Sequence, residues 1–106
     1  MRRVKLRNLA TVIRSKNAGA LMITLDIIFD KRELYEQVRD SNAITPKSLA
    51  PLYNTSDNEV FITPFDVALA IKITLPREVI SGALGDTDIY GAQQHAPLMD
   101  IEVPIP

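Results

Sequence analysis

The sequence predicts an α+β fold of the ferredoxin-like type: a split βαβ antiparallel sheet with helices on one face, plus a short N-terminal helix. Two observations predict this class. Apolar and polar residues alternate, as in half-buried strands, over residues 21–29, 59–63, 67–75 and 98–103. Segments able to form helices separate the first strand from the second and the third from the fourth. The 106 residues should form one domain, 1–106.

The first predicted element is a short helix near the N-terminus. Apolar side chains there recur with the i, i+3, i+4, i+7 spacing of one helical face: Leu6, Leu9, Ala10 and Ile13. Asn17 and Gly19 suit a left-handed turn, which would end the helix. An irregular lead-in is the alternative for this segment.

Residues 21–29 form the clearest strand, because alternate positions are apolar along its length: Leu21, Ile23, Leu25, Ile27 and Phe29. A helix over 31–40 should follow, since Asp30 can cap it and Glu33 stands three residues later, as in a capping box. That helix directs three residues toward the core: Leu34, Tyr35 and Val38.

A second, smaller helix is predicted at Thr45–Pro46, which have the types preferred for a cap and a first helical residue. Pro51 is poorly tolerated beyond the first turn of a helix. The helix therefore either bends at Pro51 or begins only at Ser48. A polar turn follows over residues 54–58.

The later strands are bounded by prolines. Pro64 marks strand 59–63 as an edge strand or marks its end. Strand 67–75 points one row of side chains inward: Leu69, Ile71, Ile73 and Leu75. Residues 86–96 can form a helix, although 91–97 can also be read as a loop. The last strand directs Met99, Ile101 and Val103 inward.

Composition excludes several function classes. A net charge of −1 argues against a nucleic-acid binder, and we interpret the N-terminal cluster Arg2, Arg3, Lys5 and Arg7 as a solvated, frayed end. The chain has no cysteine, which excludes disulfides and thiolate chemistry. No apolar run approaches the ~20 residues that span a bilayer, and no signal-peptide pattern opens the chain. We therefore expect a cytoplasmic protein without membrane association.

The predicted topology brings two polar segments together. The first strand begins at the end of the sheet where the third strand finishes, so the turn 14–19 should lie beside the loop 78–88. The opposite face of the sheet should be open, with Met22 and Ile28 as apolar islands, and such faces often mediate association. Its polar residues are Thr24, Asp26, Lys72, Thr74, Asp100 and Glu102.

Two segments, Arg14–Gly19 and Gly85–Pro97, carry a family resemblance. With them the chain resembles small bacterial proteins of unknown function that have an AtuA-like ferredoxin fold. Those are related to the C-terminal domain of the acyclic terpene utilisation protein AtuA. The resemblance extends from Leu6 to Pro104 and implies association with a larger AtuA-like protein, but no established activity. The related domain carries acidic residues at the first turn, which this chain lacks.

The candidate ligand- or partner-binding residues are polar side chains of the two converging segments: Arg14, Ser15, Lys16, Asn17, Asp86, Thr87, Asp88, Tyr90, Gln93, Gln94 and His95. Carboxylates and a histidine could hold a divalent metal. If residues 86–96 are helical, however, His95 lies about 13 Å along the axis from Asp86. We therefore assign no metal and no cofactor.

Two further chemistries are open to these segments. Glycines that precede a helix could bind an anion or acyl group through backbone N–H groups, with charge from Arg14, Lys16 and Arg77. Ser15 or Ser81 could pair with His95 as nucleophile and base. Without a known geometry, the second reading assigns no catalytic residue.

The sequence favours an accessory or structural subunit over an enzyme. Such a subunit would associate with a larger AtuA-like metabolic protein, or with further copies of itself as a homo-oligomer. The alternative is a protein that binds a small acyl or anionic ligand through the loops 14–19 and 81–95.

Overall fold

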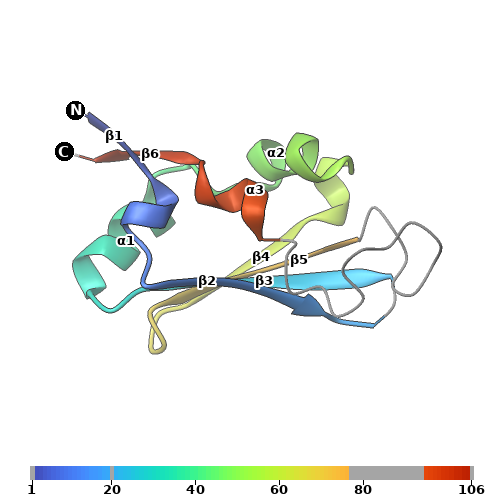
Figure 1. The fold of residues 1–106 in the computed structure, drawn as a ribbon, viewed down its shortest axis with the longest axis horizontal. Helices are drawn as coiled ribbons and strands as arrows, with labels where there is room; N and C mark the ends of the chain where they lie inside the picture. Colours follow the sequence, from blue (N-terminus) through green and yellow to red (C-terminus); the bar gives the residue numbers. More distant parts are fainter. Residues whose placement is uncertain (1, 20, 77–94, 106) are drawn as a thin grey trace.

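The computed structural model describes residues 2–19, 21–76 and 95–105. These residues form a mixed α+β fold with two antiparallel sheets (Figure 1). The larger sheet has the strand order β2-β3-β5-β4, made of Val12–Asn17, Met22–Ile28, Ala70–Pro76 and Phe61–Phe65. The smaller sheet pairs β1 with β6, which are Arg2–Lys5 and Glu102–Ile105.

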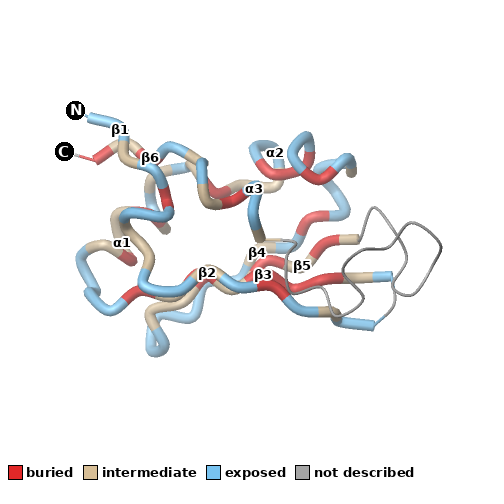
Figure 2. The backbone as a smooth tube through the Cα atoms, in the orientation of Figure 1, coloured by how far each residue is buried: buried red, intermediate tan, exposed pale blue. Residues whose placement is uncertain are grey.

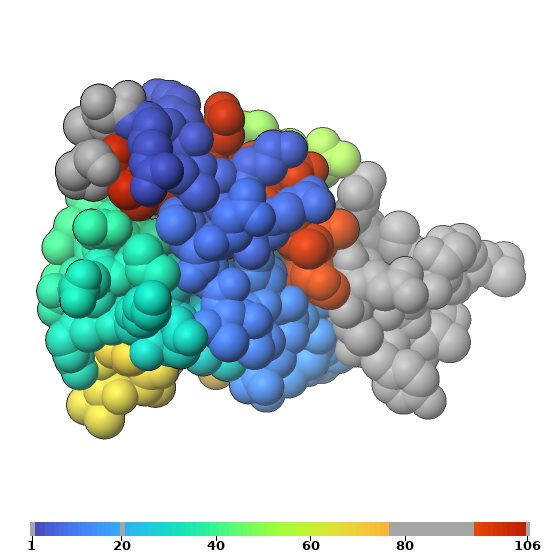
Figure 3. Space-filling model, turned by 60° about the vertical axis from the view of Figure 1, so that its left-hand side comes forward, coloured from blue at the N-terminus to red at the C-terminus, as the bar shows by residue number. Residues whose placement is uncertain are grey.

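Short helices cover one face of the larger sheet (Figure 1). The α-helices are α1, α2 and α3, at Arg32–Asp40, Pro46–Leu49 and Ala96–Met99. The 3-10 helices are η1, η2 and η3, at Leu6–Asn8, Ala50–Tyr53 and Asp57–Glu59. The β1–β6 ribbon lies on the same side, and Figure 3 shows the two ends of the chain packed against each other.

The core lies between the larger sheet and the elements that cover it (Figure 2). Alternate residues of β5 are buried, as its period-two pattern predicts, and β3 follows the same alternation except that Thr24 is buried as well. From the covering side the core receives one or two fully buried side chains from each of several elements: Leu6, Tyr35, Val38, Leu49, Leu98 and Val103. Leu34 packs partly buried against them. The predicted inward residues of α1 are thus confirmed.

The predicted N-terminal helix is wrong. The chain begins with strand β1, and only Leu6–Asn8 adopt a helical turn, before Val12–Asn17 pair with β3. Pairing with β3 gives Val12–Asn17 a hydrogen-bonded partner along the whole strand. An isolated helix of two turns, in contrast, is marginal in water. The N-terminus is not frayed either, because Lys5 and Arg7 both pair with Asp100.

The last strand was also placed in the wrong sheet. Leu98 and Met99 belong to α3, and β6 starts only at Glu102 and pairs with β1. The edge of β3 that faces away from β5 pairs with β2, and the last strand does not join the larger sheet. Asp100 and Glu102 are therefore absent from the face of the larger sheet where they were expected. In the larger sheet, β5 lies between β3 and β4.

The structure shows where the helix near Pro46 begins, how Pro51 is accommodated and where Pro64 lies in its strand. Thr45 and Pro46 begin α2, and Thr45 forms a reciprocal capping box with Ser48. The chain then changes to a 3-10 helix at Ala50, so Pro51 lies in the first turn of a new helix, where its missing N–H costs little. Pro64 lies within β4, which is an edge strand. The predicted Asp30 cap of α1 is wrong, since Lys31 occupies the cap position.

Candidate functional site

Strand β2 divides the first group of predicted site residues between two faces. Directly opposite residues of an antiparallel pair share a face. Ser15 is opposite the buried Leu25, so Ser15 and Asn17 point toward the covering helices. Arg14 and Lys16 alternate with them and point to the opposite face. The structure therefore does not gather these four side chains into one site.

Ser15 lies next to His95, the residue that precedes α3. The distance from Ser15 Oγ to His95 Nδ1 is 3.4 Å, at the long end of a hydrogen bond, and Ser15 is 8% exposed. The two candidate segments therefore meet at this contact. A nucleophile also needs an oriented base and access to its substrate, so the contact alone defines a polar link and not a catalytic centre.

The other predicted site residues lie outside the described residues: Asp86, Thr87, Asp88, Tyr90, Gln93 and Gln94. Residues 91–94 also lie outside the described residues, so the choice between helix and loop is not decided for them. The distance between His95 and Asp86 is likewise not described. Among residues 2–19, 21–76 and 95–105, no three acidic or histidine side chains gather as a metal site.

The opposite face of the larger sheet carries a different candidate site, which we call the uncovered face because no described element packs on it (Figure 1). One row of side chains crosses all four strands of this face and is apolar throughout: Val12, Ile28, Ala70 and Phe65. Val12 and Phe65, at the two ends of this apolar row, are 39% and 47% exposed. Phe61 lies on the same face of β4, four residues before Phe65, and is 61% exposed.

A charged row runs beside the apolar row on the uncovered face. Asp26 stands between Arg14 on β2 and Lys72 on β5, in directly opposite positions. Arg14 Nε donates a hydrogen bond of 3.1 Å to Asp26 Oδ2. Lys16 is exposed two residues further along β2. Arg14, Lys16 and Lys72 together give the uncovered face three cations against one carboxylate, so the face is basic although the chain carries a net charge of −1.

Thr24 lies between Lys16 and Thr74 on the uncovered face. It is 5% exposed, and its hydroxyl has no hydrogen-bond partner among residues 2–19, 21–76 and 95–105. A buried hydroxyl without a partner costs about 1–3 kcal/mol of stability. Thr24 therefore weakens the sheet at its centre.

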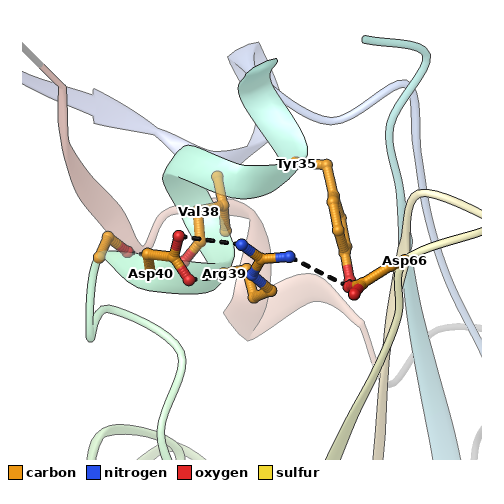
Figure 4. A network of polar contacts seen from close by, with 6 residues as sticks. Tyr35, Val38, Arg39, Asp40 and Asp66 are labelled. Carbon is orange, nitrogen blue, oxygen red and sulfur yellow. Dashed lines mark hydrogen bonds and ion pairs between the residues drawn. The ribbon is translucent and has the colours of Figure 1, made fainter. Parts of the chain in front are cut away.

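A polar network joins α1 to the hairpin between β4 and β5 (Figure 4). Tyr35 donates a hydrogen bond of 2.5 Å from its hydroxyl to Asp66 Oδ1, and Arg39 donates one of 3.1 Å to the same oxygen. Arg39 also forms two hydrogen bonds with Asp40, and its guanidinium lies 5.4 Å from the centre of the Tyr35 ring. Phe29 packs edge-on against Tyr35, with 6.0 Å between the ring centres.

Protonation equilibria in this network follow from its contacts. Burial raises the pKa of Tyr35, and its hydrogen bond to Asp66 adds to that effect. The hydrogen bonds from Tyr35 and then from Arg39 lower the pKa of Asp66. The network is ionised at neutral pH with Tyr35 as a neutral donor, which suits a structural clamp on the hairpin.

Fold and surface together define a small α+β domain whose candidate site is an apolar and basic sheet face. The chain belongs to the family described as a domain of unknown function, DUF4387, which it matches over residues 6–102. No curated protein and no solved structure matches the chain. None of the helices in the described part of the chain is long and apolar enough to cross a membrane.

Sequence reasoning missed the aromatic part of the uncovered face. Strand 59–63 was expected to have one apolar face and to end near Pro64, whereas β4 extends to Phe65. The available signal was the pair Phe61 and Phe65 around Ile62, which makes both faces of one strand apolar. A strand of that kind in a sheet covered on one side exposes aromatic rings.

Proposed function

We propose that this protein is a non-catalytic accessory subunit, located in the cytoplasm, that binds a partner protein through the uncovered face. The observation that carries this proposal is the apolar row Val12–Ile28–Ala70–Phe65 together with Phe61. Exposed apolar groups that are contiguous across a sheet favour association more than scattered ones do. The aromatic residues matter most, because Phe is enriched at protein interfaces.

The partner that we propose is a larger AtuA-like protein. Support comes from the resemblance of Arg14–Gly19 and Gly85–Pro97 to the AtuA-like ferredoxin-fold family, whose members look like companions of such a protein. Four strands about 4.8 Å apart give the uncovered face a width of about 15 Å, so the interface should lie at the small end of the specific class. A micromolar dissociation constant is the affinity that such an area favours.

Binding of the AtuA-like protein to this chain tests the proposal. Isothermal titration calorimetry should give a micromolar Kd for the wild type and at least a tenfold weaker one for Phe65→Ser, since burial of a Phe ring contributes about 1.5–3 kcal/mol. Leu52→Ser is the matched control, because Leu52 is 45% exposed on η2, on the other side of the sheet. Absence of binding, or equal losses in both variants, would count against the proposal.

A second candidate function is the binding of a small acyl or anionic ligand where the two loops meet. The contact of Ser15 with His95 favours it, because a partly buried hydroxyl and imidazole can both donate to an anion. Acyl-CoA and inorganic phosphate should then raise the melting temperature of the wild type. The same shift in His95→Gln would show that the ligand binds elsewhere.

A further inference from the structure

The charges of the uncovered face restrict which partner it can bind. Three cations, Arg14, Lys16 and Lys72, surround one carboxylate, Asp26. Asp26 is already hydrogen-bonded to Arg14 and its side chain is only 16% exposed, whereas the Arg14 side chain is 61% exposed. The charge that the face presents to an approaching molecule is therefore positive.

A second copy of this chain that presents the same face is a poor occupant of that face. Face-to-face pairing would bring three cations of each copy against three of the other, and the single Asp26 is engaged within its own sheet. Like charges placed opposite each other across an interface disfavour binding. The basic face thus disfavours a symmetric dimer in which this face of one copy meets the same face of the other.

We infer that the uncovered face binds a different protein, whose contact surface is apolar where it meets Val12 and Phe65 and acidic where it meets Lys16 and Lys72. This inference rests on the function proposed above and adds the chemistry of the partner surface. The row of Arg14, Asp26 and Lys72 lies about 7 Å from the apolar row. Lys16 lies one row further on, in the row that ends at Phe61. The partner surface should accordingly carry carboxylates beside the apolar strip that meets Val12 and Phe65.

The test measures the AtuA-like protein binding to charge variants of this chain. Lys16→Glu and Lys72→Glu should each weaken binding by roughly tenfold, and raising the salt concentration should weaken wild-type binding as well. Lys47→Glu is the matched control, because Lys47 is exposed on α2, away from this face, and its replacement changes the net charge equally. Lys16→Gln and Lys72→Gln should show smaller losses of affinity. They replace the Glu variants in the test if those unfold.

The outcomes separate this inference from the proposed function. Binding that is lost in Phe65→Ser but unchanged by salt and by the lysine variants would overturn the acidic partner and leave the subunit function standing. Absence of binding would overturn both. In sedimentation velocity on the chain alone, a dimer that dissociates in Phe65→Ser would identify a second copy as the occupant and would also overturn the inference.

Discussion

At the scale of single residues, Thr24 combines burial with an unsatisfied hydroxyl at the centre of the larger sheet. Valine has the same shape and lacks the hydroxyl. Because the desolvation of the hydroxyl is not repaid by a hydrogen bond, Thr24→Val should raise the free energy of unfolding by about 1 kcal/mol. Chemical denaturation measures this change, with Thr63→Val, on the exposed part of β4, as the control. A loss of stability in Thr24→Val would mean that the hydroxyl has a partner in solution.

Burial of single residues was largely predictable where strands are regular. Ile23, Leu25 and Ile27 repeat every second residue, and only one face of a sheet covered on one side can bury such a row. The position of Ser15 was not predictable. Its burial follows from the hairpin pairing of β2 with β3, which the helical spacing of Leu6 and Ile13 concealed.

At the scale of elements, the hairpin between β2 and β3 depends on Gly19. Its φ of +94° is one that residues with a Cβ rarely adopt, although an added Cβ would meet no atom within 4 Å. Backbone strain alone should therefore make Gly19→Ala less stable by about 1–2 kcal/mol. Gly19→Asn should lose less, since asparagine tolerates positive φ better. Equal melting temperatures for the wild type and Gly19→Ala would contradict this reading.

The two hairpins of the larger sheet explain why one turn was predictable and the other was not. The first contains Gly19, which the sequence marks as a left-handed position, although at a hairpin and not at a helix end. The second turns through Asp66–Leu69, where Leu69 has a φ of 52° without being glycine or asparagine. Its apolar sequence reads as the start of a strand. Tertiary contacts, including the hydrogen bond from Phe29 N to Leu69 O, hold it in place.

At the scale of the whole molecule, the topology was predictable in part. The sequence implies that β5 lies between β3 and β4, because a helical connection separates β3 from β4 and a short one joins β4 to β5. It does not reveal which strand pairs at the free edge of β3. Both β2 and the last strand are short and half-apolar, and the choice between them depends on the pairing of β1 with β6 at the far ends of the chain.

The clamp of Tyr35 and Arg39 on Asp66 connects α1 to the β4–β5 hairpin, which bears Phe65 of the uncovered face. Its strength should depend on pH. The pKa of Asp66 is lowered in the folded protein, so the carboxylate stabilises the fold above its unfolded pKa of about 3.9. That contribution is lost as the pH falls through the lowered folded value. Acid below the lowered folded pKa of Asp66 should therefore release the hairpin from the helix.

A double-mutant cycle measures the clamp directly. The melting temperatures of the wild type, Tyr35→Phe, Asp66→Asn and the double variant give the coupling between the two side chains. At pH 7 the coupling should be favourable, because a neutral Tyr35 donates to an ionised Asp66. Below the folded pKa of Asp66 it should shrink, since protonation removes the charge that makes this hydrogen bond strong. Coupling that stays constant from pH 7 to pH 2 would show that the ionised carboxylate is not what holds the hairpin against α1.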